Sequence, residues 1–127
     1  MRLNQVTVPA INVIESIDFY RKLGFRLIVQ NDHYARFECP DGEATFSLHL
    51  EPEVPRVGQV VIYFEHADLD GLVVSLKAKG LVFESGPVDQ SWLWREAHLR
   101  DPAGNRICLF RAGDTRRYPP WRLKDPN

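Results

Sequence analysis

Four ionisable side chains could provide metal ligands or an acid/base pair: His49, Glu65, Glu96 and His98. Imidazole titrates near neutral pH, and burial can raise the pKa of a carboxyl group toward the same range. The two histidines have neither of the close spacings that are typical of local metal motifs, with one or three residues between the ligands. Two interpretations stay open: a displaced metal or acid/base site, and polar residues at the rim of a pocket, bonded to one another and to water. The spacing favours the second.

A thiol, Cys108, lies in "RICLF", directly after the turn sequence "DPAGN". The only other cysteine is Cys39, and the two have no paired spacing such as C-x-x-C. We therefore expect no disulfide framework and no zinc motif. Two reduced thiols are typical of a cytoplasmic protein.

The chain contains the same order of elements twice: a strand, a helix and three strands. Asn12 is a candidate N-cap of the first helix and Gly24 ends it, while Asp68 and Gly80 have these roles in the second half. The expected strands are residues 3–8, 25–30, 34–39, 44–50, 59–65, 81–84, 94–99 and 106–110.

This pattern predicts an α+β fold of two tandem β-α-β-β-β modules, which form a cup-shaped mixed sheet with helices on the convex face. We expect a single domain, residues 1–127, with module one at 1–51, a linker at 52–58, module two at 59–112 and a C-terminal extension at 113–127.

Alternation along the expected strands separates an apolar face, which must cover the helices, from a mixed face. A mixed face is what a concave binding pocket requires. The candidate pocket residues are Gln5, Thr7, Arg36, Ser47, His49, Val61, Tyr63, Trp94, Glu96, His98, Cys108 and Phe110.

Two features of this face suggest a ligand class. The rings of Tyr63, Trp94 and Phe110 suit a flat or conjugated molecule, although Trp92 and Trp94 are equally typical of a core or a dimer interface. Arg36 could bind a carboxylate or phosphate, or pair with a residue on the adjacent strand.

The segments "SIDFYRKLGF", "DLDGLVVSLKAKG" and "LWREAHLRDPAGNRICLF" resemble the vicinal oxygen chelate superfamily. Its members include glyoxalase I, extradiol dioxygenases, fosfomycin-resistance enzymes and bleomycin-resistance proteins. The resemblance covers roughly residues 3 to 112 and depends mainly on "FYxxLGF" and "DPxGN", each in its expected half. It implies the cup-shaped sheet and, as in most members, a homodimer.

In metal-dependent members of this superfamily, four positions on the concave strands bind a divalent ion. The resemblance places Gln5, Ser47, Val61 and Cys108 at these positions. Val61 has no lone pair, Gln5 and Ser47 are weak neutral donors, and one thiolate does not make a stable site. We therefore expect no metal centre of the usual kind and no cofactor. The fallback ligands are the four ionisable residues named first.

Two functions follow from these observations. The favoured one is binding of a small, aromatic or amphipathic molecule in a metal-free concave pocket, for sequestration or resistance. The alternative is a metal-dependent lyase, isomerase or dioxygenase of the glyoxalase type with non-standard ligands. Whether the protein is an enzyme stays open, and no catalytic residue is assigned.

Charge and hydropathy limit the partners. The net charge of −1 argues against nucleic acid, and no apolar run is long enough to span a membrane. The expected partners are a small-molecule ligand and a second copy of the chain. The C-terminal extension could be a lid, a strap across the partner or a loose tail, and Tyr118 with Trp121 favours packing.

Overall fold

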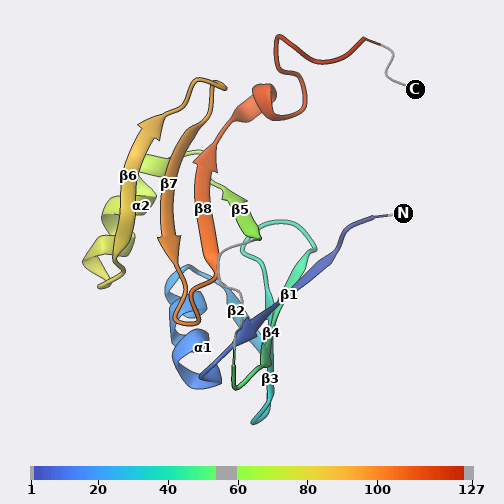
Figure 1. Ribbon diagram of the computed structural model, residues 1–127, viewed down its shortest axis with the longest axis vertical. Coiled ribbons are helices and arrows are strands. Elements are labelled where there is room, and N and C mark those ends of the chain that lie inside the picture. The colour runs from blue at the N-terminus through green and yellow to red at the C-terminus, as the bar shows by residue number, and fades with distance from the viewer. Residues whose placement is uncertain (1, 54–59, 125–127) are drawn as a thin grey trace. The chain divides into compact units, whose positions relative to one another are not determined.

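The computed structural model describes residues 2–53 and 60–124 (Figure 1). Its contacts divide the chain into two compact units. The first comprises Met1–Val61 with Arg100–Arg106, and the second comprises Ile62–Leu99 with Ile107–Asn127. Most of the expected linker lies outside the described residues. The expectation of a single domain, and of one cup formed by both sheets, stays a prediction.

The first unit contains one mixed sheet with the strand order β1-β4-β3-β2. β1 and β4 are parallel, and the other neighbours are antiparallel. The strands are β1 (Gln5–Ala10), β2 (Arg26–Gln30), β3 (Tyr34–Glu38) and β4 (Thr45–Leu50). The predicted order of elements is confirmed for this half.

One helix, α1 (Val13–Lys22), packs on this sheet. The Asn12 side chain accepts a hydrogen bond from the backbone N–H of Glu15 at 3.0 Å, which confirms the predicted N-cap. Gly24 follows the helix with φ +99°, a conformation that favours glycine. The ring of Tyr20 contacts the rings of Phe37 and Phe46, which are buried on β3 and β4. Each such buried ring contributes about 1.5–3 kcal/mol.

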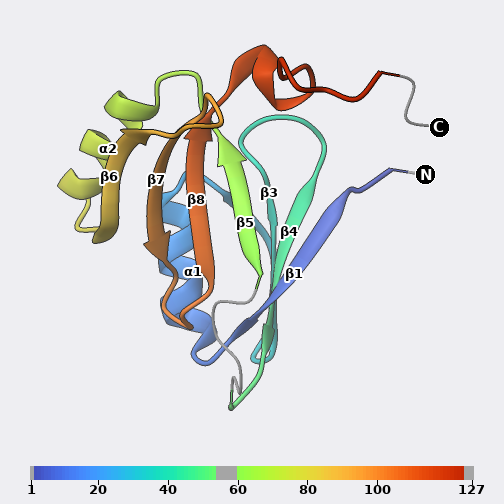
Figure 2. The ribbon, with the colours of Figure 1, turned by 45° about the horizontal axis from the view of Figure 1, so that its top comes forward.

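The second unit repeats this order with strands β5-β8-β7-β6 (Figure 2). The strands are β5 (Val61–Glu65), β6 (Phe83–Asp89), β7 (Arg95–Arg100) and β8 (Arg106–Arg111). The helix is α2 (Leu69–Ala78), whose N-cap is Asp68 as predicted. The predicted α+β fold of two β-α-β-β-β modules is thereby confirmed.

Two ion pairs of Arg95 show which face of the second sheet α2 covers. Arg95 on β7 donates to Asp70 of α2 at 2.9 Å, and to Asp89 at 3.0 Å. Side chains alternate along a strand, so Ala97 and Leu99 share the α2 face with Arg95, and both are buried. Glu96 and His98 therefore lie on the face of β7 that is directed away from α2. We call the face of each sheet that is directed away from the helix of its own unit the helix-free face.

The expected strand at residues 81–84 was placed too early, because β6 begins at Phe83 and extends to Asp89. Pro87 lies inside β6, although proline cannot donate a backbone hydrogen bond to a ladder. However, β6 is an edge strand and its register with β7 shifts between Ser85 and Val88. Edge strands and bulges accept proline.

The two signature motifs of the sequence meet in the first unit. The hydroxyl of Tyr20, from "FYRKLGF", donates to Asp101 Oδ2 at 2.6 Å. Asp101, from "DPAGN", also accepts from the backbone N–H groups of Ala103 and Asn105. Asn105 Nδ2 donates to the carbonyl of Pro9 at 2.9 Å and to Asp101. These residues therefore stabilise the fold.

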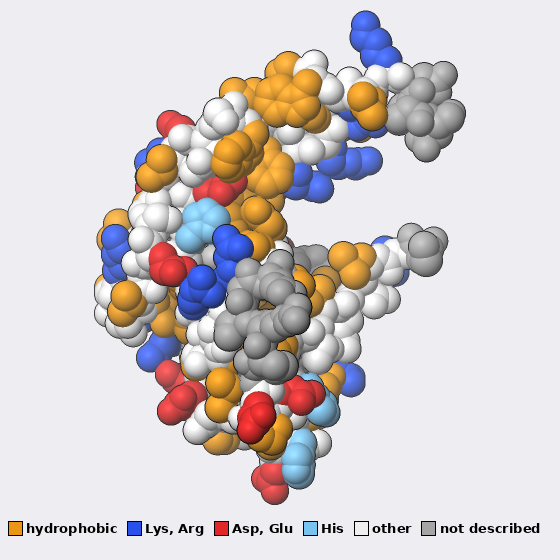
Figure 3. Space-filling model, viewed as in Figure 1, with side chains coloured by type: hydrophobic (Ala, Val, Ile, Leu, Met, Phe, Trp, Pro, Cys, Tyr) orange, Lys and Arg blue, Asp and Glu red, His pale blue; other side chains and the backbone are white. Residues whose placement is uncertain are grey.

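After β8 the chain forms a short 3-10 helix, η1 (Gly113–Arg116), and continues without further helix or strand through the described residues. Hydrophobic and basic side chains gather over this segment (Figure 3). Arg122 stacks on the ring of Tyr118 at 4.7 Å, but Trp121 is 58% exposed. In the described part of the chain more than half of Trp121 is thus exposed, and its expected packing stays a prediction. No helix of the described residues is long and apolar enough to cross a membrane.

Candidate functional site

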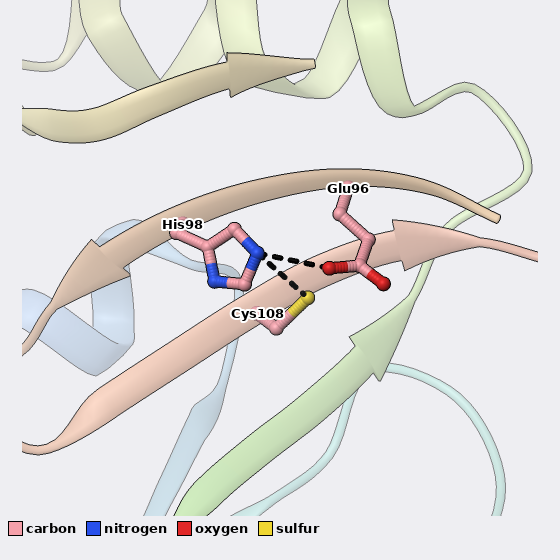
Figure 4. Close-up of side chains that lie close together, drawn as sticks. All are labelled: Glu96, His98 and Cys108. Atoms are coloured by element: carbon pink, nitrogen blue, oxygen red, sulfur yellow. Dashed lines mark hydrogen bonds and ion pairs between the residues drawn. The ribbon is translucent and has the colours of Figure 1, made fainter. Parts of the chain in front are cut away.

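The helix-free face of the second sheet contains a compact group of ionisable side chains (Figure 4). Glu96 and His98 lie two residues apart on β7, and Cys108 lies on the neighbouring strand β8. His98 Nε2 is 2.9 Å from Glu96 Oε1 and 3.9 Å from Cys108 Sγ. One ligand atom from each residue lies within 4.8 Å of the other two.

Burial differs among these three side chains. Glu96 is 3% exposed and Cys108 is fully buried, whereas the side chain of His98 is 30% exposed. The second carboxylate oxygen of Glu96 accepts a hydrogen bond from Trp92 Nε1 at 2.7 Å. Both contacts of His98 use the same nitrogen, so the imidazole does not relay a proton from Cys108 to Glu96 through its two nitrogens. The arrangement suits a shared cation or proton at Nε2.

An aromatic group adjoins these residues on the same face. The ring of Trp94 stacks on Phe110 with centroids 4.8 Å apart, and Tyr63 meets both rings edge to face. Phe110 is buried, Trp94 is partly exposed and Tyr63 is 48% exposed. The three rings thus present an apolar surface beside the polar group.

A strained turn positions the two tryptophans of this region. Leu93, between Trp92 and Trp94, has φ +71°, a conformation that leucine rarely adopts. Hydrogen bonds close the turn between β6 and β7: Leu93 N–H donates to Gln90 O at 3.1 Å, and Gln90 N–H donates to Trp94 O at 2.7 Å. Local strain of this kind is common at ligand sites.

The helix-free face of the first sheet contains a second polar group. Ser47 is fully buried and pairs in register with Thr7 on β1 and Arg36 on β3. The hydroxyls of Tyr34 and Ser47 are 2.8 Å apart, and Arg36 Nε donates to the Tyr34 hydroxyl at 2.9 Å. Gln5 Oε1 accepts from the hydroxyl of Thr45 at 2.7 Å.

The hydrogen bonds around Tyr34 change its acidity. Burial raises the pKa of the Tyr34 phenol, but the hydrogen bonds from Ser47 and Arg36, and the charge of Arg36, outweigh burial and lower it. In the described part of the chain, no carboxylate forms an ion pair with Arg36. This guanidinium therefore remains suited to bind an anionic group of a ligand.

The remaining predicted residues have other surroundings. His49 is exposed and lies 3.2 Å from Glu51. Glu65 accepts hydrogen bonds from the backbone N–H groups of Ala112 and Gly113, at the start of η1. Val61 begins β5 and is partly exposed. Of the four fallback ligands, the structure therefore brings Glu96 and His98 together, with Cys108 as the third member in place of His49 or Glu65.

Two surface depressions of the first unit lie elsewhere. One, of about 500 Å³, is lined by Ile11–Ile14 and Gln30–Asp32, and the other, of about 540 Å³, by Arg2–Asn4 and Glu43–Thr45. Neither is lined by a predicted pocket residue, so the predicted pocket stays a prediction.

Sequence reasoning omitted two residues from the site, Trp92 and Tyr34. Trp92 precedes Glu96 by four residues, and only the tight turn at Leu93 brings its indole N–H to the carboxylate. Tyr34 lies two residues before Arg36 on the same strand, so alternation already placed both on one face, but Tyr34 was not included among the predicted pocket residues.

Comparisons with known proteins agree with this architecture. The family model of the Glyoxalase/Bleomycin resistance protein/Dioxygenase superfamily matches residues 2–109. An uncharacterized protein of Mycolicibacterium smegmatis is 32% identical over 109 residues, which are 85% of this chain and 91% of that protein. The chain therefore belongs to the Glyoxalase/Bleomycin resistance protein/Dioxygenase superfamily, as the resemblance predicted.

Solved structures share the fold at lower identity. A glyoxalase/bleomycin resistance protein/dioxygenase from Nocardioides has a TM-score of 0.77 and 22% identity, covering 98% of this chain and 90% of that chain. A bleomycin-binding protein complexed with bleomycin has a TM-score of 0.71 and 20% identity, covering 87% of this chain and 98% of that chain. At these identities the likeness establishes the fold alone.

Proposed function

We propose that the protein binds a small aromatic or amphipathic molecule on the helix-free face of its second sheet. The observation that carries this proposal is the partly exposed aromatic group of Tyr63, Trp94 and Phe110, directly beside the polar side chains of Glu96 and His98. A ligand site requires this combination, because apolar surface provides affinity and a few polar atoms fix orientation.

The aromatic surface can supply the binding energy for such a ligand. Each well-oriented ring pair contributes about 0.5–1.5 kcal/mol beyond the burial of apolar area. The exposed parts of Tyr63 and Trp94 would contact the ligand. The structural likeness to a bleomycin-binding protein supports the same class of function.

The proposal does not use the metal positions of the superfamily. The side chains at three of these positions, Gln5, Ser47 and Val61, are poor metal ligands. In the structure Gln5 forms a hydrogen bond with Thr45, and Ser47 forms one with Tyr34. Sequestration of a ligand requires no metal at these positions. The metal-dependent alternative would need other ligands, and Glu96, His98 and Cys108 could supply them.

Ligand binding is tested with bleomycin and with a panel of flat amphipathic dyes, by calorimetry and by thermal melts with and without the probe. We expect Trp94→Ala to weaken binding of a positive probe about tenfold, while lowering the stability of the free protein less. Trp121→Ala, which removes an exposed ring outside the site, is the matched control. Equal losses in affinity and stability would mean that Trp94 belongs to the core, and no binding by any probe would contradict the proposal.

We also propose that the protein is a cytoplasmic homodimer. The family likeness supports the dimer, and two free cysteines support a reducing compartment. Light scattering after size-exclusion chromatography tests the dimer, and a monomeric mass would refute it. Fractionation of cells of the source organism tests the compartment.

A further inference from the structure

We propose that Glu96, His98 and Cys108 together bind one Zn²⁺ ion on the helix-free face of β7 and β8. This inference goes beyond the proposed function, because an aromatic surface binds its ligand without a metal. It also departs from the expectation of a metal-free pocket. That expectation depended on four superfamily positions, and the present set shares only Cys108 with them.

The positions of the three ligand atoms suit this ion. Tetrahedral zinc with bonds of about 2.0–2.3 Å holds its ligand atoms about 3.3–3.7 Å apart. His98 Nε2 is 2.9 Å from Glu96 Oε1 and 3.9 Å from Cys108 Sγ. The first distance must widen and the second must shorten, each by less than about 1 Å, whereas the separation between the Glu96 carboxylate and Cys108 Sγ, which lies within 4.8 Å, must shorten by up to about 1.3 Å. Figure 4 shows the three side chains directed toward one another from β7 and β8, so rotations about their side-chain bonds would provide these changes.

The identity of the ligands favours zinc over the hard cations. A thiolate and an imidazole are the donors that Zn²⁺ prefers, whereas Mg²⁺ and Ca²⁺ prefer oxygen ligands. Binding requires Cys108 to lose its thiol proton to solvent and His98 to carry its remaining proton on Nδ1. One thiolate, one carboxylate and one dication then sum to zero charge. A neutral group costs less in the buried surroundings of Glu96 and Cys108 than the carboxylate and the thiolate would cost there without the ion.

A neighbouring donor fixes one of the ligands. Trp92 Nε1 donates to Glu96 Oε2, which leaves Oε1 directed at His98. Hydrogen bonds of this kind orient ligands in metal sites. His98 is the partly exposed member, so an ion can reach the site from its side. Three protein ligands leave a fourth position for water or a ligand oxygen.

Cobalt binding by the full chain, with purification tags removed, tests the site. Co²⁺ replaces Zn²⁺ at such sites, and a thiolate ligand produces a charge-transfer absorption band that oxygen and nitrogen ligands lack. We expect one equivalent of Co²⁺ to produce this band and Zn²⁺ to displace it. Cys108→Ser should abolish the band, and His98→Ala and Glu96→Gln should each weaken binding by at least about 100-fold. Trp92→Phe, which keeps the ligands, should weaken it about tenfold.

Matched controls separate this site from adventitious binding. Cys39→Ser removes the other thiol, and His33→Ala removes an exposed imidazole, so both should bind Co²⁺ as the wild type does. If Cys108→Ser fails to fold, the partly exposed His98 still provides the test, together with a Zn²⁺-dependent rise in the melting temperature of the wild type. A spectrum without the thiolate band, loss of the band in Cys39→Ser, or no saturable binding would overturn the inference. None of these results would decide whether the surface of Tyr63, Trp94 and Phe110 binds an aromatic ligand, which the calorimetry tests separately.

Discussion

The hydrogen bond between Tyr20 and Asp101 allows a quantitative test of how the two signature motifs stabilise the fold. Tyr20→Phe removes the hydroxyl and keeps the ring, which is fully buried against Phe37 and Phe46. The lost bond is short, 2.6 Å, and its acceptor is a carboxylate that is 4% exposed. Hydrogen bonds to charged groups contribute about 1.5–3 kcal/mol. We therefore expect a loss of about 2 kcal/mol in the free energy of unfolding.

Urea unfolding followed by circular dichroism measures this loss, and the melting temperature should fall by about 5–8 °C. The slope of the urea transition should not change, because the buried area is kept. Tyr118→Phe, at an exposed ring, should stay within about 0.5 kcal/mol of the wild type. A double-mutant cycle with Asp101→Asn isolates the pair. A loss below about 0.5 kcal/mol in Tyr20→Phe would refute the reasoning, since the backbone N–H groups of the turn would then satisfy Asp101 alone.

Three further predictions concern acidity, strain and capping. Burial and the charge of Asp101 raise the pKa of the Tyr20 phenol well above 10.0. The contribution of this hydroxyl to stability is therefore complete below pH 10 and is lost as the pH rises through the folded-state pKa. The urea midpoint at alkaline pH should accordingly fall more steeply for the wild type than for Tyr20→Phe. Leu93→Asn should raise stability by about 0.5–1 kcal/mol, because asparagine tolerates positive φ, and a lower melting temperature would contradict strain at this turn. Asn12→Ala removes the cap of α1 and should cost about 1 kcal/mol in urea unfolding, whereas an unchanged midpoint would mean that water replaces the cap.

Local signals predicted the elements well. The caps at Asn12 and Asp68 and the glycines at 24 and 80 determine where the helices begin and end, and each acts through a few neighbouring residues. Strand alternation also placed Trp94 and Phe110 on one face, and their rings stack in the structure. These features depend on periods of two and 3.6 residues, which can be read from the sequence.

Contacts between strands were harder to predict. The approach of Cys108 to His98 depends on which residues of β7 and β8 lie opposite one another, and a shift by one residue would reverse every side chain. The link from Trp92 to Glu96 depends on a positive φ at leucine, for which the sequence contains no signal. The end of β6 was also misplaced, because the strand continues through Pro87, which only its edge position and its shifted register allow.

The first compact unit is discontinuous along the chain, since it includes Arg100–Arg106 from the second half. A gene fragment encoding residues 1–61 alone would therefore produce a polypeptide without two of these hydrogen bonds. The hydroxyl of Tyr20 would lack its acceptor Asp101, and the carbonyl of Pro9 would lack its donor Asn105. Mixing separately expressed halves would supply the missing turn in trans. Although the halves repeat one topology, they are complementary fragments and cannot be exchanged as independent building blocks.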